Sequence, residues 1–151
     1  MNYTFDIALK TRVIFKNFLE SFSLDQLNTK PEGFSNTIFW NIKHVVITQQ
    51  LLTYGLSSLP MLLSETEIEN FRKGSKHEKD ATEEDVMLLK AQLFSTLEQT
   101  ENDYNKGLFK TFKEYQVSTK SVLSKIEEAL KFNNFHEGIH LGYIMALKKG
   151  F

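Results

Sequence analysis

The sequence predicts an all-α protein built as a four-helix bundle with long crossover connections. Four segments repeat their apolar residues at the helical period, and the alternation typical of strands is nearly absent. The two prolines, Pro31 and Pro60, fall between these segments rather than inside them. With 151 residues the chain can bury a sizeable core, so we expect one domain over residues 1–151.

The first helix is expected from Asn2 to Phe22. Its main apolar stripe, with helical spacing, consists of Phe5, Ala8, Phe15, Leu19 and Phe22. Arg12 falls on the same stripe, so this face is expected to meet either a carboxylate or the mouth of a cavity. Residues 24–34 include a proline and a glycine and are expected to form a loop.

The second helix is expected from Thr37 to Tyr54, with Ser35 or Asn36 as its N-cap. His44 projects among apolar neighbours on this helix. A lone histidine in such a position is more often a buried residue with hydrogen-bonded ring nitrogens than a metal ligand. The role of His44 therefore depends on what packs against it.

The pattern weakens between residues 55 and 81, where a short helix is expected within Met61–Phe71. His77 stands in a run of charged residues, so we expect a solvated side chain and not a ligand. A near capping box at Thr82–Asp85 starts the third helix, which should end before Gly107.

The last helix, from about Ser121 to Lys148, has the clearest pattern. Its inward stripe, spaced four and three residues apart, is Val122, Ile126, Ala129, Asn133, His136, His140, Tyr143 and Leu147. The centre of this stripe is polar, and burying an unsatisfied polar group costs about 1–3 kcal/mol. His136 and His140 lie one turn apart, about 5–6 Å at Cβ, so one metal ion could bind both imidazoles.

Because bundles build metal sites from facing helices, we predict a three-histidine site of His44, His136 and His140. The letters around Glu137 also satisfy HExxH, the metalloprotease pattern in which the glutamate is the general base. That pattern needs a third protein ligand downstream, and no His, Asp or Glu follows His140. The sequence therefore argues against a protease.

These same residues resemble the DinB/YfiT-like superfamily of small metal-binding four-helix bundles, in its DinB-like branch. The stretch from Asn36 through Trp40 to His44 is similar to the family's N-x-x-x-W-N-x-x-H motif. The stretch from His136 through His140 to Gly142 is similar to its terminal H-x-x-x-H-x-G segment. The resemblance covers nearly the whole chain.

The resemblance implies a divalent metal, zinc or nickel, held by the three histidines, and a homodimer. Some members of the family are transferases or isomerases that activate a low-molecular-weight thiol such as bacillithiol, mycothiol or glutathione. We therefore expect a metal-dependent enzyme acting on a small molecule, either a thiol-dependent S-transferase or a hydrolase. The alternative is a non-catalytic, metal-stabilised bundle that acts in binding, sensing or stress response.

Three roles remain open for Glu137, the one candidate catalytic residue. It could act as a base, orient an imidazole, or lie in solvent. Asn133 and Tyr143 could line a cavity or simply pack, and Trp40 is more often a core residue than a platform for substrate.

Composition limits the remaining functions. The net charge of −1, with no dense cluster of Lys or Arg, argues against a nucleic-acid partner. There are no cysteines, so any thiolate must come from a cosubstrate. No apolar run reaches transmembrane length and Met1–Glu20 does not have the pattern of a signal peptide, so we expect no membrane partner and a cytoplasmic location.

Overall fold

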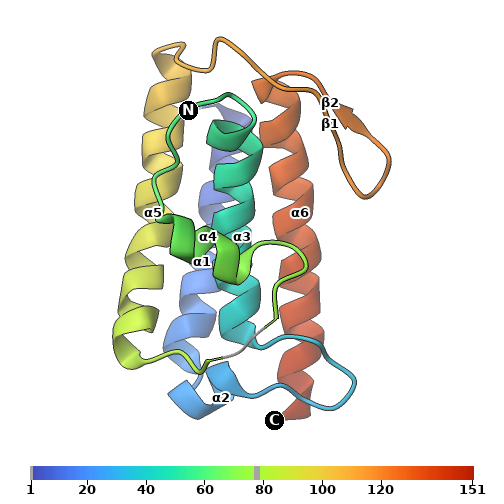
Figure 1. Cartoon of the computed structure of the whole chain (residues 1–151). Helices are drawn as coiled ribbons and strands as arrows, with labels where there is room; N and C mark the ends of the chain where they lie inside the picture. Colours follow the sequence, from blue (N-terminus) through green and yellow to red (C-terminus); the bar gives the residue numbers. More distant parts are fainter. Residues whose placement is uncertain (1, 77–78) are drawn as a thin grey trace.

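The computed structural model describes residues 2–76 and 79–151, so the prediction for His77 lies outside the described residues. Four long helices form a bundle: α1 (Tyr3–Ser21), α3 (Ile38–Gln50), α5 (Glu83–Asn105) and α6 (Ile126–Leu147). The predicted all-α bundle is confirmed (Figure 1). Helix α3 continues into a π-helical turn, Leu51–Gly55.

The helices are not arranged as a simple up-and-down bundle. Helices α1 and α6 run in one direction, and α3 and α5 run in the other (Figure 1). Helix α1 packs against α5 and α6, and α3 packs against the same two helices. Because α3 and α5 are parallel, the chain between them must cross the length of the bundle, and this crossover carries α4 (Glu65–Phe71).

The helix starts follow local capping chemistry. Thr37 caps α3 through a bond to the Trp40 amide, so the cap lies beyond the predicted Ser35 or Asn36. Thr82 and Asp85 form the capping box predicted for α5. Each cap satisfies an amide that the first turn leaves free.

Two predicted boundaries are wrong. The expected loop at residues 24–34 contains a short helix, α2 (Leu24–Asn28), which starts with a capping box between Ser23 and Gln26. Helix α6 begins at Ile126 rather than Ser121, because β2 (Val122–Leu123) pairs with β1 (Tyr115–Gln116) in a small antiparallel hairpin. Val122 is therefore a strand residue and not the start of the inward stripe of α6.

The core lies between the four helices and is mostly apolar. The predicted stripe of α1 is buried at Phe5, Ala8, Phe15 and Leu19, whereas Phe22 is only half-buried. Arg12, on the same stripe, is fully buried and meets the carboxylate of Glu137 on α6. Of the two surroundings predicted for Arg12, a carboxylate or the mouth of a cavity, the carboxylate is the correct one.

A second buried cation attaches the crossover to the bundle. The Lys43 ammonium on α3 donates to Glu67 Oε1 on α4 at 2.6 Å and also to Gln92 on α5. Burial alone would raise the pKa of Glu67, but hydrogen bonds from Lys43, Gln92 and the Ser64 amide together lower it to about 2. This contact fixes α4 beside the middle of α3, where His44 lies.

In the described parts of the chain, no helix is long and apolar enough to cross a membrane.

Candidate metal centre

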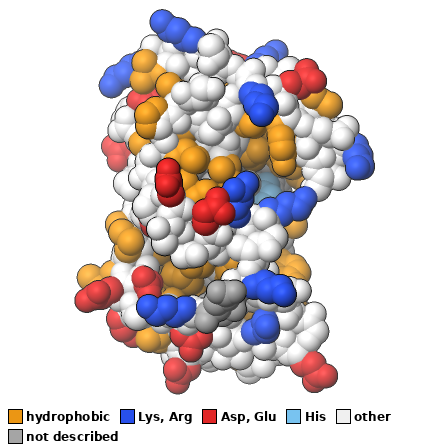
Figure 2. Space-filling model, viewed as in Figure 1, with side chains coloured by type: hydrophobic (Ala, Val, Ile, Leu, Met, Phe, Trp, Pro, Cys, Tyr) orange, Lys and Arg blue, Asp and Glu red, His pale blue; other side chains and the backbone are white. Residues whose placement is uncertain are grey.

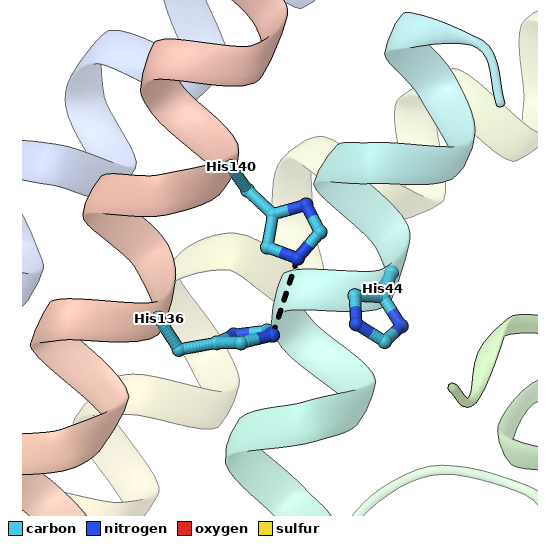
Figure 3. Close-up of side chains that lie close together, drawn as sticks. All are labelled: His44, His136 and His140. Atoms are coloured by element: carbon cyan, nitrogen blue, oxygen red, sulfur yellow. Dashed lines mark hydrogen bonds between the residues drawn. The ribbon is translucent and has the colours of Figure 1, made fainter. Parts of the chain in front are cut away.

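Three histidines from two helices meet on one side of the bundle. His44 comes from α3, and His136 and His140 come from successive turns of α6 (Figure 3). One ring nitrogen from each lies within 4.8 Å of the others. The Nε2 atoms of His136 and His140 are 3.2 Å apart. The structure thus brings together the three residues that the sequence singles out.

Hydrogen bonds hold two of the rings in the tautomer that a metal requires. His44 Nδ1 lies 2.6 Å from the Phe71 carbonyl, and His140 Nδ1 lies 2.8 Å from Asn41 Oδ1. A carbonyl oxygen can only accept, so Nδ1 carries the proton and Nε2 keeps its lone pair in each ring. The Asn41 amide is itself oriented by a bond from Nδ2 to the Thr37 carbonyl at 2.8 Å.

Burial keeps the histidines neutral. Desolvation, with the nearby His140 and His44 adding to it, lowers the pKa of His136 to about 3. Desolvation and His44 lower the pKa of His140 to about 4, and desolvation also lowers the pKa of His44. All three imidazoles are therefore uncharged at neutral pH, which is the form that binds a metal.

This arrangement fits a divalent metal. Two nitrogens bound to one tetrahedral zinc at ~2.05 Å lie ~3.3 Å apart, close to the 3.2 Å between the two Nε2 atoms of α6. Two lone pairs directed at each other over that distance repel unless a proton or a cation lies between them. His136 Nδ1 is buried and has no hydrogen-bond partner among the described residues. The three histidines therefore form a group that could hold a metal ion.

The histidines line a cavity of about 770 Å³, a size typical of small-molecule sites. Trp40 lies on its wall and stacks on the His44 ring, with the ring centroids 4.6 Å apart and 10° between the planes. Tyr143 also lines the cavity, which is one of the two roles that the sequence left open for it. In Figure 2 a histidine side chain is visible at the floor of a hollow, with Lys or Arg and hydrophobic side chains around it.

A family model for the DinB superfamily matches residues 9–144 and so includes all three histidines. The chain belongs to the DinB superfamily. This agrees with the resemblance carried by the histidine motifs. Comparison with curated proteins gives no match.

In this DinB-superfamily protein, Glu137 is fully buried and does not line the cavity. Its Oε1 accepts from Arg12 Nε at 3.0 Å, Arg12 Nη2 at 2.7 Å and Asn133 Nδ2 at 2.8 Å. The solvated role that was open for Glu137 is therefore wrong. Asn133 is likewise buried and does not line the cavity. The catalytic role of Glu137 stays a prediction, and no hydrogen bond among the described residues joins its carboxylate to a histidine ring.

Two hydrogen-bond acceptors of the DinB-superfamily site were not found from the sequence. Asn41 lies three residues before His44 and belongs to the motif quoted above, so the motif offered a signal for it. The Phe71 carbonyl offered none, because it is a backbone atom on the crossover and any residue type could supply it. Its place depends on how α4 packs, which local periodicity does not reveal.

Proposed function

We propose that this DinB-superfamily protein is a metal-dependent enzyme that acts on a small molecule through zinc or nickel bound by His44, His136 and His140. The observation that carries the proposal is the convergence of three neutral imidazoles on the wall of a cavity large enough for a small molecule. When bound, the metal would supply Lewis acidity that lowers the pKa of a thiol or a water.

The surrounding residues have separate tasks in this proposal. Asn41 and the Phe71 carbonyl hold the protonated Nδ1 atoms of two rings, so that both Nε2 lone pairs face the same point. Trp40 covers one face of the His44 ring and limits access of water from that side. Thr48 Oγ1 lies 3.2 Å from His44 Nε2 and lines the cavity, where its hydroxyl can donate to a ligand instead.

Of the two reactions expected from the family resemblance, we propose the thiol-dependent S-transferase for the first test. The chain has no cysteine, so the thiol would be a small cosubstrate. Its sulfur would form a bond to an electrophilic carbon while the bond to the leaving group breaks. The leaving group would depart with the electron pair, and the thiol proton would pass to solvent. A cavity of about 770 Å³ has room for both molecules.

Metal analysis of the protein purified without a polyhistidine tag tests the site. We expect about one zinc or nickel per chain, and its loss in His136→Ala. His77→Ala is the matched control, because the sequence predicts that His77 is not a ligand, and it should keep the metal. If the untagged protein holds no stoichiometric metal and gains no stability on titration with zinc or nickel, the metal site is refuted.

The reaction class needs a second experiment. Metal-loaded protein is assayed with alkylating electrophiles in the presence of bacillithiol, mycothiol or glutathione, and with activated esters in their absence. Turnover that requires both thiol and metal would support the transferase. Turnover of esters without thiol would identify a hydrolase. Silence in both assays from protein with a full metal complement would favour a non-catalytic bundle.

We also propose a homodimer that forms through α6. The outward face of this helix carries no charge from Phe135 to Ala146, and its exposed residues are Phe135, Gly138, Ile139, Gly142, Tyr143, Met145 and Ala146. A Cβ atom added at either glycine would meet nothing within 4 Å, so another helix could approach closely there.

Light scattering should give a dimer that Met145→Asp dissociates. Met87→Asp, at an exposed methionine of α5, should not. A monomeric wild type would refute the dimer.

A further inference from the structure

We propose that the cavity beside the histidines binds an organic anion, whose carboxylate, sulfonate or phosphate group is held at the mouth by Arg72, Lys73 and Lys113. These are the charged side chains among the described residues that line the cavity, and none of the described Asp and Glu residues lines it. All three are exposed, whereas the histidines deeper in the cavity are buried or half-buried. Basic side chains are visible at the edge of the hollow in Figure 2.

The cations are placed by backbone contacts and not only by long, flexible side chains. Arg72 and Lys73 follow directly after α4, whose last residue, Phe71, bonds to His44 through its carbonyl. The Lys113 amide donates to the Leu56 carbonyl, which lies just after the π-helical turn, at 2.6 Å. Two segments far apart in the sequence therefore bring positive charge to the same cavity.

Among residues 2–76 and 79–151, little negative charge offsets these cations. Arg72 forms an ion pair with Glu69 at 2.8 Å, but both side chains are about half exposed or more, so the pair is well screened. In the described part of the chain, Lys73 and Lys113 have no ion pair. The three imidazoles are neutral and would add no negative charge to balance a divalent metal. A cavity with one sign of charge concentrates ligands of the opposite sign.

The wall between the histidines and the mouth is largely apolar. It includes Leu51, Leu52, Leu56, Val117, Phe132 and Ile139. Apolar walls with a few charged groups at one end select a ligand with a hydrophobic body and a polar terminus. The ligand class is therefore an amphiphilic organic anion, oriented with its charged end outward and its body toward the histidines.

This inference rests on the proposed function, because the bound anion would be a substrate or cosubstrate of the same site. Its binding does not require the metal, however, so it is tested on metal-free protein. The probe is 1-anilinonaphthalene-8-sulfonate, and the reference is N-phenyl-1-naphthylamine, which lacks only the sulfonate. Fluorescence titration should give one saturable site for the sulfonate, with affinity that falls as sodium chloride is raised.

The decisive variant is Lys73→Ala/Lys113→Ala. It should weaken binding of the sulfonate about 3- to 10-fold and leave the neutral amine unchanged, because each exposed charge contact has a modest effect. Lys10→Ala/Lys131→Ala has the same net charge and substitutes lysines that do not line the cavity, so it should bind both probes like wild type. Circular dichroism checks that both variants are folded.

The two proposals fail separately. If zinc binds but the double substitution at the mouth changes sulfonate binding no more than the control does, the anion site is refuted and the metal site stands. If no metal binds but sulfonate binding keeps this dependence, the metal site is refuted and the anion site stands. Displacement of the bound sulfonate by benzoate or by phenyl phosphate, with benzyl alcohol as the neutral reference, distinguishes a carboxylate from a phosphate ligand. Displacement by benzyl alcohol as effective as by both anions would also refute the anion site.

Discussion

The buried pair of Arg12 and Glu137 offers a quantitative test of how the bundle is held together. Replacing Arg12 by Met removes bonds of 3.0 and 2.7 Å to Glu137 Oε1 and a bond of 3.1 Å to the Leu93 carbonyl. Both charged side chains are 0% exposed, so solvent does not screen the change. The carboxylate would then be buried with Asn133 as its remaining partner. Breaking a buried pair in this way costs about 3–5 kcal/mol.

Urea unfolding of metal-free protein at pH 7, followed by far-ultraviolet circular dichroism, measures this loss. In thermal unfolding the same loss lowers Tm by about 6–20 °C for a chain of this size. Arg72→Met is the matched control, because it makes the same substitution in an exposed pair and should cost at most about 1 kcal/mol.

The double variant Arg12→Met/Glu137→Met removes both buried charges. It should recover most of the stability lost in Arg12→Met, because an apolar pair of similar volume carries no desolvation penalty. A loss below about 1 kcal/mol in Arg12→Met would refute the reasoning, as would a double variant no more stable than the single one. Glu137→Gln that keeps its metal, its fold and full turnover would exclude this residue as a base.

Three further predictions concern the metal centre. Because the pKa values of His136 and His140 lie at about 3 and 4 in the folded protein and at about 6.5 when unfolded, the unfolded chain binds more protons below pH 6.5. Their contribution to stability is thus complete above pH 6.5 and decreases toward pH 4, so the urea midpoint of metal-free protein should fall between pH 7 and pH 5. An unchanged midpoint would contradict the lowered pKa values. Trp40 is the only tryptophan, so its fluorescence should be quenched by one equivalent of Ni²⁺ in wild type and not in His136→Ala. Loss of the orienting bond in Asn41→Ala should weaken metal affinity about 10- to 100-fold. Asn134→Ala is the control, because the Asn134 side chain donates to the Thr4 carbonyl and not to a histidine, and it should leave the affinity unchanged. Equal affinities in the two variants would argue against the orienting role of Asn41.

Much of the fold could be predicted because the signals were local. The apolar period of α1, α3, α5 and α6 is strong, and the start of α5 carries its own capping box. The start of α6 was misplaced because the residues before it continue the helical spacing of apolar side chains, and spacing alone does not exclude a hairpin. Helix α2 was missed although Ser23 and Gln26 form a capping-box pattern, because proline and glycine downstream favoured a loop.

The candidate site, like the fold, was predictable only in part. Two histidines one turn apart on an inward stripe could be paired from sequence, and the third followed from the fold class. The direction in which each side chain of α6 points was harder to predict. Glu137 is adjacent to a ligand, yet its carboxylate faces the centre of the bundle and not the cavity. Neighbouring helical residues are rotated by about 100°, so His136 can face the cavity while Glu137 faces the centre of the bundle. Whether the Glu137 side is buried or solvated depends on where α1 packs, which the sequence of α6 does not show.

The crossover between α3 and α5 has a consequence for how such proteins diversify. Parallel neighbours require a connection about as long as the bundle, and in this protein that connection supplies both an acceptor for a ligand histidine and two of the cations at the mouth. The three histidines and most of the cavity wall belong to the rigid helices, whereas two of the cations at the mouth belong to a segment that tolerates substitution and changes of length. Such a protein could change the polar end of the ligand that its cavity accepts by altering the crossover, while the helices that carry the three histidines stay unchanged.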